Sequence, residues 1–399
     1  MEYSLLNQIV LLYCILLVKC EIFHIKESEE SFCPYLDTCL TLAQFTDSSN
    51  EYIQWNTTLI LMPGTHYLNE VFSVTNVGRF EILALDYYNT SEQENGSVHI
   101  VCNSEAFFEF LLCDSVHFTQ VTFIDCGGNI VSIVGTFFLY NSTVIGQNIT
   151  KSAFTFDYTH QVIIDNSYFI SNYGSSLQTL FNPEYGVYNI YSTGPFCGAI
   201  CAISSNILIV KTEFIKNIQA IYARQNTSVT IDSSKFEQNM ILPVQIGLAS
   251  SCLVADSSTE IIVQKSSFVN NIVGGVLRLV ASTLIVEHSN FSSNDYRNIS
   301  GGGSIVSYDS TVYLFQSRFT YNNAPYGGVV YSSSSTMYVN QSRFYYNTAD
   351  YYGGVLYLDT CNLSISNCIF FQNSAYGMSV LVISEGNIII SRINTPYRV

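Results

Sequence analysis

The stretch GGVLRLVASTLIVEHSNFSSN, from Gly274 to Asn294, is one unit of the repeat that decides the fold. GVLRLV begins the unit at Gly275, TLIVEH continues it from Thr283, and SNF ends it at Phe291. All three segments are typical of strands, and in the middle one Leu284 and Val286 share one face. Three strands of this length, separated by tight turns, close one coil of a solenoid.

The unit recurs along the chain with constant internal spacing. Eight Phe residues are each followed three positions later by Asn: Phe169–Asn172, Phe214–Asn217, Phe236–Asn239, Phe268–Asn271, Phe291–Asn294, Phe319–Asn322, Phe344–Asn347 and Phe370–Asn373. Sixteen positions before each Phe lies a small residue: Ala153, Gly198, Ala220, Cys252, Gly275, Gly303, Gly328 or Gly354. Two positions before each Phe lies Ser167, Thr212, Ser234, Ser266, Ser289, Ser317, Ser342 or Cys368. Two degenerate units run from Phe107 to Phe123 and from Gly128 to Val144, with Cys126 and Gln147 in the Asn place.

This repeat predicts an all-β, single-stranded right-handed parallel β-helix, a pectate-lyase-like solenoid of about ten or more coils. Equivalent residues of successive coils then stack in ladders about 4.8 Å apart. We expect the Phe ladder to fill the core with offset-stacked rings. The Gly ladder is expected to permit a tight turn or to leave space for those rings. The Asn ladder is expected at a bend, in left-handed geometry, bonded to the backbone and to neighbouring Asn side chains.

The chain divides into three predicted regions. Residues 1–20 are interpreted as a signal peptide because Ile9–Val18 is a run of ten apolar residues; an uncleaved anchor or a buried strand is the alternative. Residues 21–55 are an N-terminal cap region, and residues 56–399 form the β-helix with an inserted loop at 173–197. Leu59–Leu68 is expected to form a strand, a Pro-Gly turn and another strand. Gly386–Val399 begins a coil that is not completed. A structural piece of a larger surface protein is therefore a further alternative for the whole chain.

Sequons and cysteines favour an exported, disulfide-bonded glycoprotein. Ten N-x-S/T sequons occur, at Asn56, Asn89, Asn95, Asn141, Asn148, Asn226, Asn290, Asn298, Asn340 and Asn362. The chain has 12 cysteines. Cys33 and Cys39 form a candidate local pair, whereas Cys102 and Cys126 lie about one coil apart and are expected to be stacked neighbours. No cysteine or histidine spacing matches a zinc site.

Charge excludes one class of partner. The formal net charge is −16, and only 12% of residues are charged. Such a chain repels phosphate backbones and contains no basic stripe with interleaved aromatics, so no nucleic-acid partner is expected. Beyond the predicted signal peptide, no segment is long and apolar enough for a transmembrane helix.

Short motifs resemble known repeat proteins. GGVL at Gly353–Leu356, CGAI at Cys197–Ile200 and the Phe–Asn pairs resemble the GGAI and FxxN repeats of chlamydial polymorphic outer membrane proteins. CLTLAQF, LMPGTHYL and FIDCGGN, beginning at Cys39, Leu61 and Phe123, resemble secreted right-handed β-helix proteins of simple animals and protists. The resemblance covers residues 33–391. It implies a right-handed β-helix and, from the chlamydial proteins, a surface adhesin.

Enzymatic β-helices that act on polysaccharides need paired carboxylates, or a metal or Arg, on neighbouring coils. The candidate carboxylates are Asp165, Asp232, Glu260, Glu287, Asp309 and Asp359. Counted from the Phe of each unit, they supply no acidic pair on adjacent coils. The six histidines (24, 66, 99, 117, 160 and 288) are scattered. No calcium-binding motif surrounds Asp37 or Asp47, the acidic loop positions considered for calcium. The sequence therefore predicts no catalytic, cofactor-binding or metal-binding residues.

Tyrosines on the outer strand faces favour binding instead. They are Tyr308, Tyr313, Tyr326, Tyr331, Tyr338, Tyr345, Tyr346, Tyr351, Tyr352 and Tyr357. A row of Tyr and Ser on a flat sheet would stack sugar rings or receive a protein, although Tyr also simply favours exposed strands. The hypothesis is a non-enzymatic extracellular or cell-surface protein that recognises glycans or cell-surface proteins. A carbohydrate-active enzyme (lyase, hydrolase or epimerase) of the pectate-lyase-like superfamily is the alternative.

Overall fold

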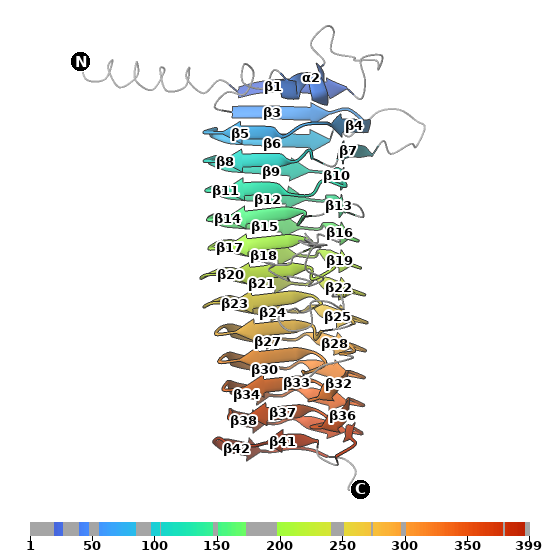
Figure 1. Cartoon of the computed structure of the whole chain (residues 1–399), viewed down its shortest axis with the longest axis vertical. Helices are drawn as coiled ribbons and strands as arrows, with labels where there is room; N and C mark the ends of the chain where they lie inside the picture. The colour runs from blue at the N-terminus through green and yellow to red at the C-terminus, as the bar shows by residue number, and fades with distance from the viewer. Residues whose placement is uncertain are drawn as a thin grey trace, which may run out of the picture.

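The computed structural model describes residues 20–26, 40–47, 56–84, 97–103, 105–146, 151–172, 198–240, 251–272, 274–296, 301–377 and 380–395. These residues form an all-β, right-handed parallel β-helix of about 11 turns, as predicted (Figure 1). Each complete coil contributes one strand to each of three long parallel sheets, called sheets A, B and C below. The strands lie across the long axis of the rod, so the hydrogen bonds between coils run along it.

Sheet A is the longest sheet, and it contains the middle strand of each coil. Its strands, in spatial order, are β2 (Leu40–Thr41), β1 (Cys20–Lys26), β3 (Asn56–Leu61), β6 (Arg79–Ala84), β9 (Ser115–Thr119), β12 (Thr136–Tyr140), β15 (Gln161–Asp165), β18 (Asn206–Val210), β21 (Ser228–Asp232), β24 (Glu260–Gln264), β27 (Thr283–Glu287), β30 (Thr311–Phe315), β34 (Thr336–Asn340), β38 (Asn362–Ser366) and β42 (Ile388–Ser391). The second and fourth residues of the regular five-residue strands face the core, which explains the alternating pattern of the sequence.

Sheet B contains the short strand that carries the Phe of each unit. Its strands are β4 (Gly64–Leu68), β7 (Val98–Cys102), β10 (Val121–Ile124), β13 (Thr143–Ile145), β16 (Tyr168–Ile170), β19 (Glu213–Ile215), β22 (Lys235–Glu237), β25 (Ser267–Val269), β28 (Asn290–Ser292), β31 (Arg318–Thr320), β35 (Arg343–Tyr345) and β39 (Ile369–Phe371). The expected strand, Pro-Gly turn and strand at Leu59–Leu68 are confirmed as β3 and β4.

Sheet C contains the first strand of each unit. Its strands are β5 (Phe72–Thr75), β8 (Phe108–Leu111), β11 (Asn129–Ser132), β14 (Phe154–Asp157), β17 (Ile200–Ile203), β20 (Ile221–Arg224), β23 (Leu253–Asp256), β26 (Leu277–Val280), β29 (Ile305–Tyr308), β33 (Val330–Ser333), β37 (Leu356–Asp359) and β41 (Leu381–Ile383). In the last coils a small side sheet follows sheet B, made of β32 (Asn323–Tyr326), β36 (Thr348–Tyr352) and β40 (Ser374–Ala375).

The Phe ladder predicted from the repeat fills the core of the later coils. Successive Phe side chains from Phe169 to Phe370 are in register, and their ring centroids lie 4.6 to 5.2 Å apart in stacked geometry. The earlier coils use Phe from all three sheets, with edge-to-face pairs such as Phe118–Phe123 at 5.1 Å. The degenerate units keep the same register, because Phe123 pairs with Val144 and Val144 with Phe169.

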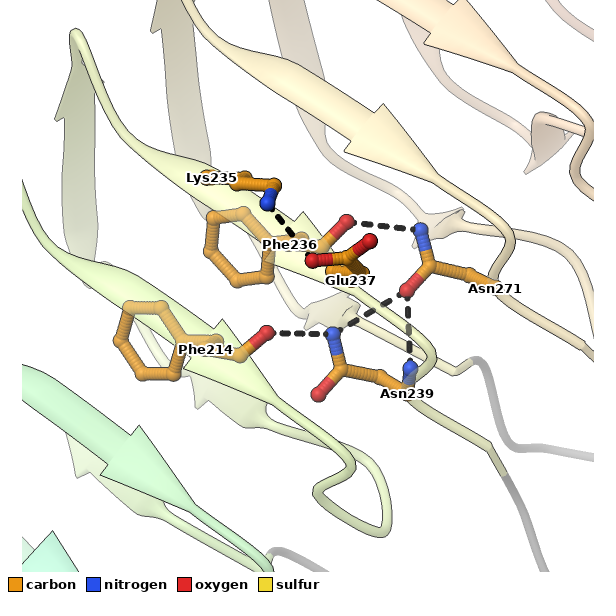
Figure 2. A network of polar contacts seen from close by, with 6 residues as sticks. All are labelled: Phe214, Lys235, Phe236, Glu237, Asn239 and Asn271. Atoms are coloured by element: carbon orange, nitrogen blue, oxygen red, sulfur yellow. Dashed lines mark hydrogen bonds and ion pairs between the residues drawn. The ribbon is translucent and has the colours of Figure 1, made fainter.

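The Asn ladder is hydrogen-bonded as predicted, but its expected left-handed geometry is wrong. Asn239 Nδ2 donates to the carbonyl oxygen of Phe214 at 2.9 Å and to Oδ1 of Asn271 at 3.1 Å, and Figure 2 shows how these side chains lie. The left-handed residue is instead the one before each Asn: φ lies between 50° and 57° at Ser171, Lys216, Gln238, Asn270, Ser293, Tyr321, Tyr346 and Gln372. That residue bends the chain, and the Asn side chain then satisfies buried backbone groups inside the corner.

The corner between sheets A and B has the same construction with a smaller side chain. Ser266 follows left-handed Lys265, is 2% exposed, and its Oγ accepts from the backbone N–H of Ser234 at 3.1 Å. The same hydroxyl donates to the carbonyl oxygen of Gln264 at 2.8 Å. The Ser, Thr and Cys column of the repeat is therefore a second buried polar ladder.

The Gly ladder permits close backbone approach and does not make room for Phe rings. A Cβ on Gly328 would lie 2.4 Å from the carbonyl oxygens of both Gly354 and Thr348. A Cβ on Gly354 would lie 2.5 Å from the carbonyl oxygen of Ser374. At Gly328 and Gly354 the missing Cβ thus makes room for the backbone of the neighbouring coil, which neither of the two explanations offered by the sequence had named.

The first described residues form one end of the stack. Strand β1 begins at Cys20, the last residue of the predicted signal peptide, and pairs in register with β3. Helix α2 (Leu42–Asp47) then covers the core, and its buried Phe45 lies 5.9 Å from the Phe72 ring. Gln44 and Thr41 bond reciprocally at the start of α2, which is a capping box. Residues 1–19, the Cys33–Cys39 pair and the inserted loop 173–197 lie outside the described residues.

The expected proximity of Cys102 and Cys126 is confirmed as a disulfide between adjacent coils, with a sequence separation of 24 residues. Cys201 is also disulfide-bonded. Free thiols in the described ranges belong to Cys113, Cys252, Cys361 and Cys368, all buried.

We expect removal of the Cys102–Cys126 bridge to lower the free energy of unfolding by about 3–4 kcal/mol, because the unfolded chain loses a closed loop of this length. Urea unfolding of the double variant Cys102→Ala, Cys126→Ala measures it. Cys113→Ala is the control, since this buried cysteine forms no disulfide. If the double variant loses no more stability than twice the control, the bridge contributes nothing beyond packing.

Candidate functional site

The candidate carboxylates stay apart in the observed register. Asp165, Asp232 and Glu287 lie in one outer column of sheet A, with Val210 between the first two and Gln264 between the last two. Glu260 begins its strand at the opposite edge of sheet A. Asp309 lies in a left-handed corner, and Asp359 ends strand β37 of sheet C. No two of these six carboxylates are register neighbours on adjacent coils.

The histidines and other metal-ligand types are also dispersed. His66 is 1% exposed and bonds the carbonyl oxygen of Met62 at 2.8 Å, which identifies it as a structural residue. Burial, with Arg79 nearby, lowers the pKa of His117. Across the described part of the chain, no three His, Cys, Asp or Glu side chains gather closely enough to hold a metal ion. No described helix has the length and apolar character needed to cross a membrane.

The ten tyrosines predicted to form a row on a flat sheet are distributed over several faces. Tyr313 and Tyr338 stack on sheet A with centroids 4.9 Å apart. Tyr345 lies on sheet B, and Tyr346 occupies a left-handed corner. The remaining six lie on sheet C and the side sheet: Tyr308, Tyr326, Tyr331, Tyr351, Tyr352 and Tyr357. We call these six the tyrosine cluster.

The tyrosine cluster is continuous because each ring contacts another. The Tyr331 and Tyr357 rings are in register on adjacent coils and stack with centroids 5.5 Å apart. The Tyr326 ring meets that of Tyr357 edge to face at 5.3 Å and that of Tyr351 at 5.2 Å. At the other end, the Tyr308 and Tyr331 rings lie 6.1 Å apart. The cluster thus joins the outer face of sheet C to the side sheet.

Arg278 extends the tyrosine cluster and was not identified from the sequence. Its guanidinium lies 4.9 Å from the centre of the Tyr308 ring, and the residue is only 8% exposed. Its register neighbours are Val254 and Val306, so an arginine occupies a column that is otherwise apolar here. The single arginine between two valines of this column was the feature of the sequence that could have identified Arg278. A cation over an aromatic face is attracted by the ring quadrupole, which holds Tyr308 in place.

The stacking determines what the cluster presents to a partner. The Tyr331 and Tyr357 rings are nearly parallel, with an interplanar angle of 4°, so one face of each ring is directed at the other ring. Burial, together with the neighbouring tyrosines, raises the pKa of Tyr331, so its hydroxyl remains a neutral donor and acceptor at physiological pH. Tyr351 and Tyr352, at 52% and 50% exposure, add accessible apolar area beside these hydroxyls.

Sequons in the described ranges lie at accessible positions. Asn141, Asn226 and Asn362 are exposed, and Asn56, Asn290 and Asn340 are partly exposed. None of these six side chains belongs to the buried Asn ladder. Attachment of a glycan at these positions is therefore compatible with the packed core.

Comparison with known proteins supports the fold. The family model for the right handed beta helix region matches residues 246–392. Similar solved structures include the surface adhesin PfbA of Streptococcus pneumoniae, with 10% identity, a TM-score of 0.33, and coverage of 81% of this chain and 85% of that chain. The catalytic domain of a GH87 α-1,3-glucanase in complex with tetrasaccharides has 9% identity, a TM-score of 0.32, and coverage of 93% and 69%. Pectate lyase Pel9A has 11% identity, a TM-score of 0.22, and coverage of 87% and 78%.

No curated protein matches the sequence. The family model that matches describes the β-helix as a fold, whereas the resemblance to chlamydial polymorphic outer membrane proteins rests on the short repeat motifs. At these low identities and TM-scores the solved structures assign no activity to this chain.

Proposed function

We propose that this chain is a non-enzymatic extracellular recognition protein that binds a protein partner through the tyrosine cluster. The observation that carries the proposal is the continuous contact of six tyrosine rings from Tyr308 to Tyr352 on one side of the rod. Tyrosine contributes a large, rigid contact area at low cost in side-chain entropy, and it adds a hydroxyl for hydrogen bonding.

A protein partner fits the cluster better than a stacked sugar. Sugar rings stack on aromatic faces, and the stacked pair removes one face of Tyr331 and one face of Tyr357 from such contact. The edges and hydroxyls that remain accessible match a mixed surface of apolar side chains and backbone polar groups. The Cys102–Cys126 disulfide and the accessible sequons support an extracellular location.

We expect the double variant Tyr331→Ser, Tyr357→Ser to weaken partner binding by about tenfold or more, because central aromatic residues carry most of the binding energy of an interface. The measurement is biolayer interferometry of the immobilised protein against panels of purified extracellular-matrix and cell-surface proteins and of neutral glycans. Tyr168→Ser is the matched control, since Tyr168 is 41% exposed on sheet B, away from the cluster.

Two results would contradict the proposal. One is a binding partner whose affinity is equally affected by Tyr168→Ser and by the double variant. The other is cleavage of neutral or acidic polysaccharides by the wild-type protein, detected as new reducing or unsaturated chain ends, which would favour the carbohydrate-active alternative. Binding confined to neutral glycans would replace the protein partner by a sugar ligand.

A further inference from the structure

A second surface lies at the corner between sheets A and B in the later coils. An open groove of about 580 Å³ is lined there by His288, Gln316, Ser317, Arg318, Gln341, Arg343, Asn367 and Ile369. His288, Gln316, Gln341 and Asn367 are the left-handed corner residues of four successive coils, so their side chains project outward. Arg318 and Arg343 begin the neighbouring strands β31 and β35. We call this surface the arginine groove; it is separate from the tyrosine cluster.

The two arginines of the groove are adjacent like charges. Arg318 and Arg343 pair in register, so their backbones lie about 4.8 Å apart across the sheet. Like charges directly opposite each other in a sheet are destabilising unless something of opposite sign lies near them. Among the described residues, ion pairs join Arg79 to Glu81 and Lys235 to Glu237, and neither arginine of the groove takes part in one.

Lys235 provides an internal comparison, because it occupies the same column of sheet B as the two arginines. Two residues later on its strand, Glu237 places a carboxylate oxygen 2.6 Å from the Lys235 ammonium (Figure 2). The corresponding residues after Arg318 and Arg343 are Thr320 and Tyr345. The repeat thus neutralises the cation of this column in one coil and leaves two cations without a carboxylate in a chain of net charge −16.

The groove also orients these charges and adds polar groups beside them. The Arg318 guanidinium lies 5.4 Å from the centre of the Tyr345 ring, a contact that fixes the guanidinium and leaves its donors available. Gln316 Nε2 donates to Gln341 Oε1 at 2.7 Å, so the two amides form a hydrogen-bonded pair along the corner. A line of amides therefore runs parallel to the line of guanidinium groups.

We propose that the arginine groove binds an acidic polysaccharide, with its sulfate or carboxylate groups on Arg318 and Arg343. A guanidinium binds either group through two parallel hydrogen bonds. A small single anion would use one arginine, whereas the open groove along the rod suits an extended chain with an anionic group on successive units.

The experiment measures binding of the full chain to immobilised heparin, polygalacturonate and neutral dextran by biolayer interferometry, at low and at physiological salt. We expect binding to at least one acidic polymer, no binding to dextran, and an affinity that falls as salt rises. The double variant Arg318→Gln, Arg343→Gln should lower that affinity at least tenfold. Heparin binding alone would identify sulfate as the preferred group, and polygalacturonate binding alone would identify carboxylate.

Two controls separate the groove from general charge and from misfolding. Lys211→Gln, Lys216→Gln removes the same charge from two corners of another coil, where glutamine is compatible with the left-handed backbone, as Gln316 shows. Arg318→Lys, Arg343→Lys keeps the charge but removes the paired donors, and an intermediate loss is expected. The proposal is overturned if no acidic polymer binds. It is also overturned if Lys211→Gln, Lys216→Gln weakens binding as much as Arg318→Gln, Arg343→Gln does. Failure of polysaccharide binding does not bear on the proposal that the tyrosine cluster binds a protein. Failure of protein binding by the tyrosine cluster likewise does not bear on the arginine groove.

Discussion

Replacing Asn271 by Ala is expected to lower the free energy of unfolding by about 3–5 kcal/mol, because several buried polar groups lose their partner at once. Asn271 is 1% exposed. Its Nδ2 donates to the carbonyl oxygen of Phe236 at 3.1 Å and to Asn294 Oδ1 at 3.0 Å. Its Oδ1 accepts from the backbone N–H of Asn239 at 3.0 Å and from Asn239 Nδ2 at 3.1 Å. The alanine would leave these groups unsatisfied inside the corner, out of reach of water.

Urea unfolding followed by circular dichroism measures the effect of Asn271→Ala. Asn290→Ala in unglycosylated protein is the control, since Asn290 lies partly exposed on the outer face of sheet B, one coil away. We expect the control to change stability by less than about 0.5 kcal/mol. Equal losses in the two variants would show that the Asn ladder contributes no more than any surface amide.

Replacing Phe268 by Ala is expected to cost about 3–5 kcal/mol, the range for removing a buried aromatic side chain. The Phe268 ring is fully buried between Phe236 and Phe291, with centroids at 4.7 and 4.6 Å. Hydrogen-bonded strands hold the coils above and below at their spacing, so these rings cannot close the cavity. The variant loses apolar burial and two ring contacts together.

Thermal unfolding of Phe268→Ala and Phe315→Ala provides the matched comparison. Phe315 lies on the outer face of sheet A and is only partly buried, so the same deletion there should cost about 1 kcal/mol or less. A similar loss in both variants would mean that the Phe ladder fills space without stabilising the stack. Because each coil contacts mainly its neighbours, we expect the loss to be local to the coils around Phe268.

Much of the fold was predictable because each unit keeps constant internal distances, sixteen positions from the small residue to Phe and three from Phe to Asn, although successive Phe residues are 22 to 45 positions apart. A Phe such as Phe268 reaches the Phe rings of neighbouring coils only if each coil closes after a complete set of three strands. The Phe–Asn pairs therefore determined the register, and the degenerate units followed it through Val144. The N-terminal coils were harder to recognise in the sequence, because their core contains Phe from all three sheets in edge-to-face pairs and not one Phe column.

The corners and the binding surfaces were harder to predict for a physical reason. Left-handed residues at the corners include Lys216, Gln238 and Tyr321. They are exposed, and no single residue type is common to these positions. The Asn beside them is the constant residue, and it was assigned the wrong geometry. Likewise, the alternation of apolar and polar residues along a strand indicates that Tyr331 points outward. It does not indicate which neighbouring strands form one continuous outer surface with Tyr331.

The direction of the hydrogen bonds between coils has a mechanical consequence. In Figure 1 the first and last coils lie at opposite ends of the rod, and the bonds between coils run from one end toward the other. Tension between the two ends is therefore parallel to these bonds and separates the outermost coil first, one strand at a time. A force directed across the rod, along the strands, would instead shear all the bonds of a coil together. Such a protein yields gradually when stretched lengthwise and resists sideways load.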